Sequence, residues 1–214
     1  PRAGLQQLAQ AGCGRVLVAA PVGGVPGHPE QGGAVRESAC RGRGLDGLFS
    51  EIEQDGEANS AVTRNLHHNV HESLVDAFTE ALVGRVEQLV VGDPLDEATD
   101  VSALISRAER DRVHGWIDEA RAEGATVACG GDVDTDGVLR PTVLTGVRAD
   151  MKVCAQEVFG PVVGIAAYRD LDDALRSAND TRYGLQAAIF TQRLDDALKA
   201  ALTLDFGGVC INEV

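Results

Sequence analysis

Hydrophobic and polar residues alternate along the chain in two distinct patterns. Apolar side chains recur at helical spacing from Ser73 to Val90, which predicts a helix with one buried face. The segment from Val158 to Tyr168 is almost continuously apolar, as is typical of a strand buried on both faces. By the same criteria, further helices are predicted at 106–123, 170–179 and 194–204, and further strands at 15–20, 69–72, 125–129, 141–147, 185–191 and 209–212.

Several helix ends are marked by residues that favour termination or capping. Ser106 can accept a hydrogen bond from a backbone N–H of the first turn, and Gly124 can end the same helix. Asp170 opens an acidic stretch, where negative charge favours a helix N-terminus. The alternation of strands with helices predicts an α/β fold with a parallel sheet and helices on both of its faces.

The clear alternation begins near residue 60. We therefore expect two parts, an irregular segment 1–60 and an α/β domain 61–214. Turn-forming residues dominate the stretch 21–33, which predicts a loop. The chain begins with Pro1 rather than Met and has no recognisable signal peptide, so we expect a processed, trimmed or partial chain.

The composition excludes several classes of partner. The formal charge is −14, from 33 acidic and 19 basic residues, which disfavours nucleic acid and anionic membranes because both need a basic surface. No apolar run approaches the roughly 20 residues needed to cross a bilayer. Five cysteines without paired spacing suggest reduced thiols, and we expect a cytoplasmic protein.

Three histidines, His67, His68 and His71, form the nearest approach to a metal motif. On a strand, His67 and His71 would share a face, and imidazole is a good zinc ligand. No second group of ligands stands at partner spacing. We therefore expect these histidines to be structural or exposed, and we expect no metal.

The motif that indicates a chemistry is Glu157-Val158-Phe159-Gly160-Pro161-Val162, followed by Asn179-Asp180 and Tyr183-Gly184-Leu185. In order and spacing it resembles the closing part of the catalytic domain of the NAD(P)-dependent aldehyde dehydrogenases. Weaker matching pieces extend the resemblance from Val70 to Val214, about two-thirds of the chain.

The resemblance implies a reaction and two site residues. In these enzymes a cysteine thiolate attacks a small aldehyde, hydride passes to NAD or NADP, and a carboxylic acid is released. By carry-over, Glu157 binds the hydroxyls of the nicotinamide ribose and Phe159 borders the nicotinamide. A carboxylate is a suitable acceptor for two neighbouring hydroxyls. The alternative is that Glu157 is a solvated loop acid and Phe159 fills the core.

The family's nucleophilic cysteine is not found. Depending on the alignment, Asn59 or Val62 stands at its position, and neither can form a thiohemiacetal. The general-base glutamate and the dinucleotide-binding domain that usually precede this region have no counterpart either. The sequence thus assigns no catalytic residue.

Three hypotheses follow from this combination. We expect a truncated or diverged aldehyde dehydrogenase that is weakly active or inactive alone. The alternative is a non-catalytic pseudoenzyme or interaction scaffold, and an open sheet edge would then favour a homo-oligomer or capture of a partner. A third hypothesis uses Ser60 as the nucleophile of an esterase.

Overall fold

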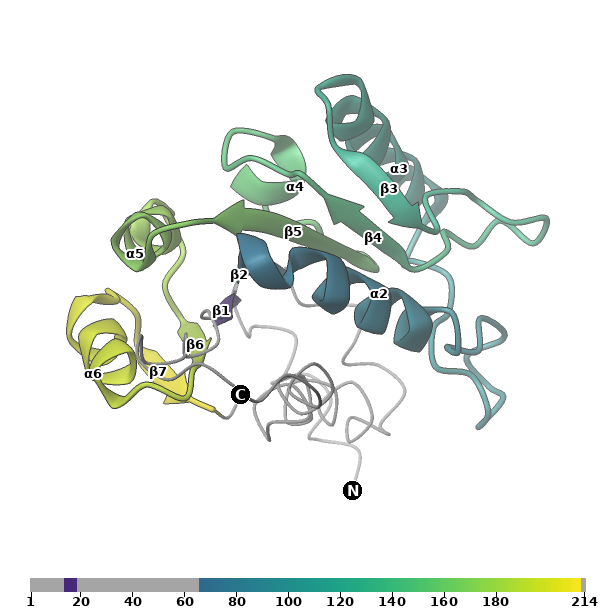
Figure 1. Ribbon diagram of the computed structural model, residues 1–214. Helices are drawn as coiled ribbons and strands as arrows, with labels where there is room; N and C mark the ends of the chain where they lie inside the picture. The colour runs from purple at the N-terminus through teal and green to yellow at the C-terminus, as the bar shows by residue number, and fades with distance from the viewer. Residues whose placement is uncertain (1–13, 19–65, 213–214) are drawn as a thin grey trace, which may run out of the picture.

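A seven-stranded sheet forms the centre of the protein in a computed structural model that describes residues 14–18 and 66–212 (Figure 1). Its strand order is β3-β4-β5-β2-β1-β6-β7. All neighbours run parallel except β3, which pairs antiparallel with β4. The strands are β1 Gly14–Val18, β2 Leu66–His71, β3 Thr126–Cys129, β4 Thr142–Thr145, β5 Val162–Tyr168, β6 Gln186–Phe190 and β7 Gly208–Ile211.

Helices cover both faces of this sheet. Because successive strand residues point to opposite faces, Val143 packs with the helix on one face and Leu144 with those on the other. One face carries α2, and the other carries α3 to α6. The helices are α2 Val75–Val86, α3 Arg107–Ala122, α4 Lys152–Ala155, α5 Leu171–Asn179 and α6 Leu194–Thr203, and a short 3-10 turn, Glu72–Leu74, precedes α2. The predicted α/β class with helices on both faces is confirmed.

Three apolar clusters hold these layers together. Phe78 and Leu82 of α2 pack on the first face against strand residues such as Ile165. On the opposite face, Val113 and Ile117 of α3 lead one cluster. The third joins α5 and α6 to β6 through residues that include Leu175, Ala200 and Ile189. Each cluster contains residues that are almost inaccessible to water, so the helices are fixed by packing rather than by propensity alone.

Two predicted elements differ from the observed ones for local reasons. The strand expected from Val158 begins only at Val162, because Phe159 has a positive φ of 48° and Pro161 has no backbone N–H to donate. The antiparallel pairing of β3 was not expected in a parallel sheet. The turn at 130–137 reverses the chain, so β3 and β4 form a hairpin. Helix α4 has only four residues and left no periodicity to detect.

The predicted caps are confirmed. Ser106 precedes α3 in an extended conformation, and its Oγ accepts a hydrogen bond from the Glu109 N–H at 3.2 Å. Asp170 Oδ1 accepts from the N–H groups of Asp172 and Asp173 at the start of α5. These contacts satisfy backbone donors that the helix itself leaves unpaired.

Replacing Ser106 with alanine should lower the free energy of unfolding by about 1 kcal/mol, because the Glu109 N–H loses its acceptor. Ser106→Asp is the matched control, since a carboxylate keeps the acceptor at the helix N-terminus. Urea denaturation of the three proteins measures the difference. An alanine variant as stable as the aspartate variant would show that the cap contributes nothing.

Candidate functional site

The segment that carries Glu157 and Phe159 lies at the amino edge of the sheet. It leads directly into β5, whose neighbours are β4 and β2. The first residues of these strands are close in register, since Thr142 pairs with Val162 and Leu66 with Val163. Open α/β sheets usually bind ligands at the opposite, carboxyl edge. Glu157 and Phe159 differ from that rule, since they lie in the loop before β5, at the amino edge.

Phe159 is held in an unusual backbone conformation. Its φ of 48° lies in the left-handed region, which a bulky side chain rarely adopts, and 46% of the residue is exposed. The preceding Val158 is 1% exposed and packs in the cluster below α3. Such strain costs roughly 1–3 kcal/mol and is concentrated at functional sites. The loop thus buries one side chain and presents an aromatic ring to solvent, so the alternative that Phe159 fills the core is not supported.

The residues after Phe159 fix the loop against its surroundings. Gly160 is buried, and a Cβ added there would lie 3.1 Å from Val113 Cγ1 of α3. The Pro161 carbonyl accepts a hydrogen bond from the Thr142 N–H at 2.8 Å, and the Val162 N–H donates to the Gly160 carbonyl at 2.8 Å. The turn is therefore attached to both α3 and β4.

Arg112 of α3 makes a third attachment. Its Nη2 donates to the Val158 carbonyl at 2.8 Å, across 46 positions of sequence. The same guanidinium bonds Glu109 through Nε and Nη2 and lies 4.4 Å from the ring centre of Trp116. Arg112 is not recognisable as a site residue from the sequence, because only the fold brings it to this loop.

Glu157 is half-buried and fits the role of an acceptor. Within residues 14–18 and 66–212, its carboxylate has no hydrogen-bond or ion-pair partner. Glu157 precedes the exposed Phe159 by two residues, and a carboxylate without a partner among the described residues is chemically suited to accept hydrogen bonds from the vicinal hydroxyls of a ribose. The residues present thus fit a nicotinamide nucleotide.

The segment 179–185, which contains the other pieces of the motif, has two different roles. Arg182 Nη2 donates to Gln156 Oε1, so the segment before β6 is joined to the residue before Glu157. Asn179 instead has a structural role, because its Nδ2 donates to the Thr203 carbonyl and its Oδ1 accepts from the Asp205 N–H. The motif thus contains both site-forming and fold-forming residues.

The cysteines in the described part of the chain form no disulfide. Cys154 is 5% exposed within an apolar cluster. Burial, followed in size by an opposing backbone hydrogen bond at Val143 and then by the Glu87 charge, gives a net rise in the pKa of the Cys129 thiol. A raised pKa means less thiolate, which is the nucleophilic form. Cys210 is half-buried on β7 and lies near Gln186.

The two described histidine side chains of β2, His68 and His71, make separate contacts. His68 is 3% exposed, its ring centre lies 5.3 Å from that of Phe78, and its Nδ1 has no hydrogen-bond partner among the described residues. His71 Nδ1 instead lies 2.9 Å from Ser73 Oγ. The His67 side chain lies outside the described residues. Among the side chains that the structure describes, no group of three or more His, Cys, Asp or Glu is arranged to hold a metal ion.

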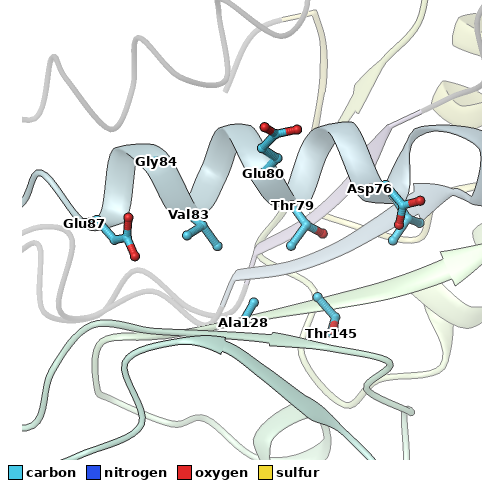
Figure 2. A pocket seen from close by; sticks show the side chains of 9 residues that line it. Asp76, Thr79, Glu80, Val83, Gly84, Glu87, Ala128 and Thr145 are labelled. Carbon is cyan, nitrogen blue, oxygen red and sulfur yellow. The ribbon is translucent and has the colours of Figure 1, made fainter.

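An open groove of about 580 Å³ lies elsewhere, between α2 and the strands β3 and β4 (Figure 2). It is lined by Val75, Asp76, Thr79, Glu80, Val83, Gly84, Glu87, Ala128 and Thr145. Three of these residues are acidic, and neither Glu157 nor Phe159 is among them. The groove is thus distinct from the candidate cofactor loop.

The segment aligned with the nucleophile region lies outside the described residues. This applies to Asn59, Val62 and Ser60. Their roles stay predictions. The structure does show that the strand following this segment, β2, is the neighbour of β5 in the sheet.

Comparison with known proteins decides the family. The model of the aldehyde dehydrogenase family matches residues 47–214, most of the chain. The chain belongs to the aldehyde dehydrogenase family. This agrees with the motif order read from the sequence and with the position of the Glu157 loop before β5.

Three related aldehyde dehydrogenases illustrate how the match is distributed. A 3-sulfolactaldehyde dehydrogenase of Priestia aryabhattai is 46% identical over 144 residues, 67% of this chain and 30% of the relative. A betaine aldehyde dehydrogenase of Brucella anthropi is 41% identical over 161 residues, 72% of this chain and 32% of the relative. The solved structure of a glyceraldehyde-3-phosphate dehydrogenase from Methanocaldococcus jannaschii, complexed with NADP, is 31% identical with a TM-score of 0.70, and the match covers 95% of this chain and 39% of that one.

The chain therefore spans about a third of the length of these family members. None of the helices that the structure describes combines the length and apolarity that crossing a membrane requires.

Proposed function

We propose that this chain is part of the catalytic domain of an NAD(P)-dependent aldehyde dehydrogenase, the part that holds the nicotinamide end of the cofactor. The complete reaction oxidises an aldehyde to a carboxylic acid. The observation that carries the proposal is the Glu157–Phe159 loop. Among the described residues the Glu157 carboxylate has no partner, Phe159 is exposed, and hydrogen bonds to α3 and β4 hold the strained backbone.

Each of the two residues has a defined part in the proposal. The Glu157 carboxylate accepts hydrogen bonds from the two hydroxyls of the nicotinamide ribose. The exposed Phe159 ring borders the nicotinamide and excludes water from one side of it. NAD or NADP, when bound, supplies the acceptor for the hydride that leaves the aldehyde carbon.

We further propose that the chain alone oxidises aldehydes weakly or not at all. The reaction begins with attack by a thiolate, and none of Cys129, Cys154 and Cys210 stands in the family's nucleophile context. Cys154 is close to Glu157 in sequence but is buried in the core, where no substrate carbon reaches it. Cofactor binding is therefore the property to measure before turnover.

Thermal unfolding of the full chain with and without NAD and NADP tests cofactor binding. A nucleotide at ~100 times its dissociation constant stabilises the folded state by about 2.7 kcal/mol, a shift of several degrees in Tm. Glu157→Ala should abolish most of that shift, because it removes the acceptor for both hydroxyls. Glu80→Gln, on the rim of the α2 groove, is the control and should keep it.

A cooperative transition that neither nucleotide moves would contradict cofactor binding by this chain. That result would favour the alternative, a non-catalytic scaffold, and binding partners would then be sought. Retention of the full shift in Glu157→Ala would instead show that the nucleotide binds elsewhere.

Two further properties belong to the proposal. A cytoplasmic location is supported by the cysteines of the described residues, which form no disulfide and so suit a reducing compartment. The expected homo-oligomer and the division of the chain near residue 60 stay predictions.

A further inference from the structure

Helix α3 and the Glu157–Phe159 loop are joined by a polar cluster centred on Arg112, in addition to their apolar contacts. Arg112 reaches the Val158 carbonyl with a nitrogen that also bonds Glu109, and its guanidinium stacks on Trp116. Glu109 and Trp116 stand three positions before and four after Arg112, so all three lie on one helical face. The guanidinium is thereby fixed in orientation before it meets the loop.

The accepting carbonyl belongs to the peptide that joins Val158 to Phe159. Because the peptide is planar, holding this carbonyl fixes the orientation of the N–Cα bond about which φ of Phe159 is defined. That φ is 48°, a strained value, and the Phe159 residue is 46% exposed. A hydrogen bond from an ionised donor is about twice as strong as a neutral one, so Arg112 is suited to holding a strained peptide.

We propose that Arg112 is a positioning residue for cofactor binding. By holding the Val158 carbonyl, it keeps Phe159 in the left-handed conformation and fixes the peptide that links Phe159 to the residue after Glu157. The inference rests on the proposed function, because positioning matters only where Glu157 and Phe159 meet a nucleotide. Arg112 itself touches neither the cofactor nor the substrate in this scheme.

The chain offers a matched control on the same helix. Arg110 Nη1 donates to the Gly137 carbonyl at 3.1 Å, which is also a contact between α3 and a loop. Gly137 lies at the tip of the turn between β3 and β4, beyond the Val133–Leu139 bridge, and makes none of the contacts described above that hold the Glu157 loop. Arg110→Met therefore removes a comparable contact without reaching the cofactor loop, whereas Arg112→Met removes the donors to Val158 and Glu109 and keeps the aliphatic stem.

Two readouts are measured on the full chain of each variant. Hydrogen exchange at the Val162 amide, which donates to the Gly160 carbonyl, reports on the loop without any ligand. Calorimetric titration with NAD and with NADP reports on binding. In Arg112→Met we expect exchange at Val162 to be about tenfold faster and the nucleotide dissociation constant to rise about tenfold, equivalent to about 1.4 kcal/mol. Arg110→Met should change each by less than about twofold, within the scatter of an unrelated contact.

Arg112→Lys is a second variant that should restore part of both losses. Its ammonium keeps the charge but cannot satisfy Val158 and Glu109 with the same planar fork. If Arg112→Met does not fold, Arg112→Lys decides the question by the same two measurements.

The outcomes separate this inference from the function on which it rests. Wild-type protein that binds neither NAD nor NADP overturns the proposed function and this inference with it. Wild type that binds a nucleotide, with an Arg112→Met variant of equal affinity, overturns only the positioning role, even where exchange is faster. Equal exchange in wild type and Arg112→Met also overturns it.

Discussion

Gly130→Ala is expected to lower the free energy of unfolding by about 3 kcal/mol or more, because both strain and overpacking act at this position. Gly130 has a φ of 68°, and a Cβ added there would lie 2.0 Å from the Pro141 carbonyl oxygen and 2.8 Å from its carbon. Both atoms are backbone, so no side chain can move aside. The hairpin between β3 and β4 would have to open.

Gly146 provides a closely matched control for that substitution. It has the same φ of 68°, but among the described residues an added Cβ would have just the Gly124 carbonyl oxygen within 4 Å, at 4.0 Å. Gly146→Ala therefore carries the conformational cost alone, about 1–2 kcal/mol. Guanidinium denaturation of the two variants isolates the effect of the clash as the difference between them. Equal losses would mean that the hairpin relaxes to accommodate the methyl group.

The strand end of this turn, at Gly130, also bears on the candidate site, unlike the tip of the turn at Gly137. Close approach at Gly130 sets the start of β4, where the Thr142 N–H donates to the Pro161 carbonyl. The same Thr142 accepts from the Gly131 N–H through its Oγ1 at 2.9 Å. A displaced hairpin would thus release one of the contacts that hold the Glu157 loop. We expect Gly130→Ala to weaken nucleotide binding as well as stability.

Much of the fold was predictable because its signals are local. The amphipathic spacing of α2 and the caps at Ser106 and Asp170 are each contained within a few residues. The apolar run of β5 likewise reflects burial on two faces of a sheet. Such patterns depend only on the backbone geometry of one element, so a single sequence suffices to detect them.

The features that were missed depend on contacts between distant segments. The late start of β5 follows from the strained Phe159 and from the anchoring of its loop to α3 and β4. Nothing in the sequence indicates that Arg112 reaches Val158. Its spacing from Glu109 and Trp116 is compatible with contacts on one helical face, but the sequence does not show which loop the guanidinium meets. The motif identified Glu157 and Phe159 through family resemblance, whereas the support of their loop required the fold.

Acidification should destabilise this protein through His68 before most carboxylates are protonated. Burial lowers the pKa of His68 from 6.5 to about 4 in the folded state. Below pH 6.5 the unfolded chain therefore takes up a proton that the folded chain does not, and stability falls as the pH decreases. The loss continues until about pH 4, and by pH 5 it amounts to roughly 2 kcal/mol.

His68→Leu should remove this part of the pH dependence. Leucine can remain packed against Phe78 in the apolar environment. It also removes the buried His68 Nδ1, which has no hydrogen-bond partner among the described residues. Urea denaturation of both proteins at pH 7 and pH 5 gives the two differences in free energy of unfolding. We expect the wild type to lose roughly 2 kcal/mol more than the variant between these pH values. Equal losses would show that His68 becomes protonated without unfolding the sheet, which would require water or a carboxylate to reach its ring.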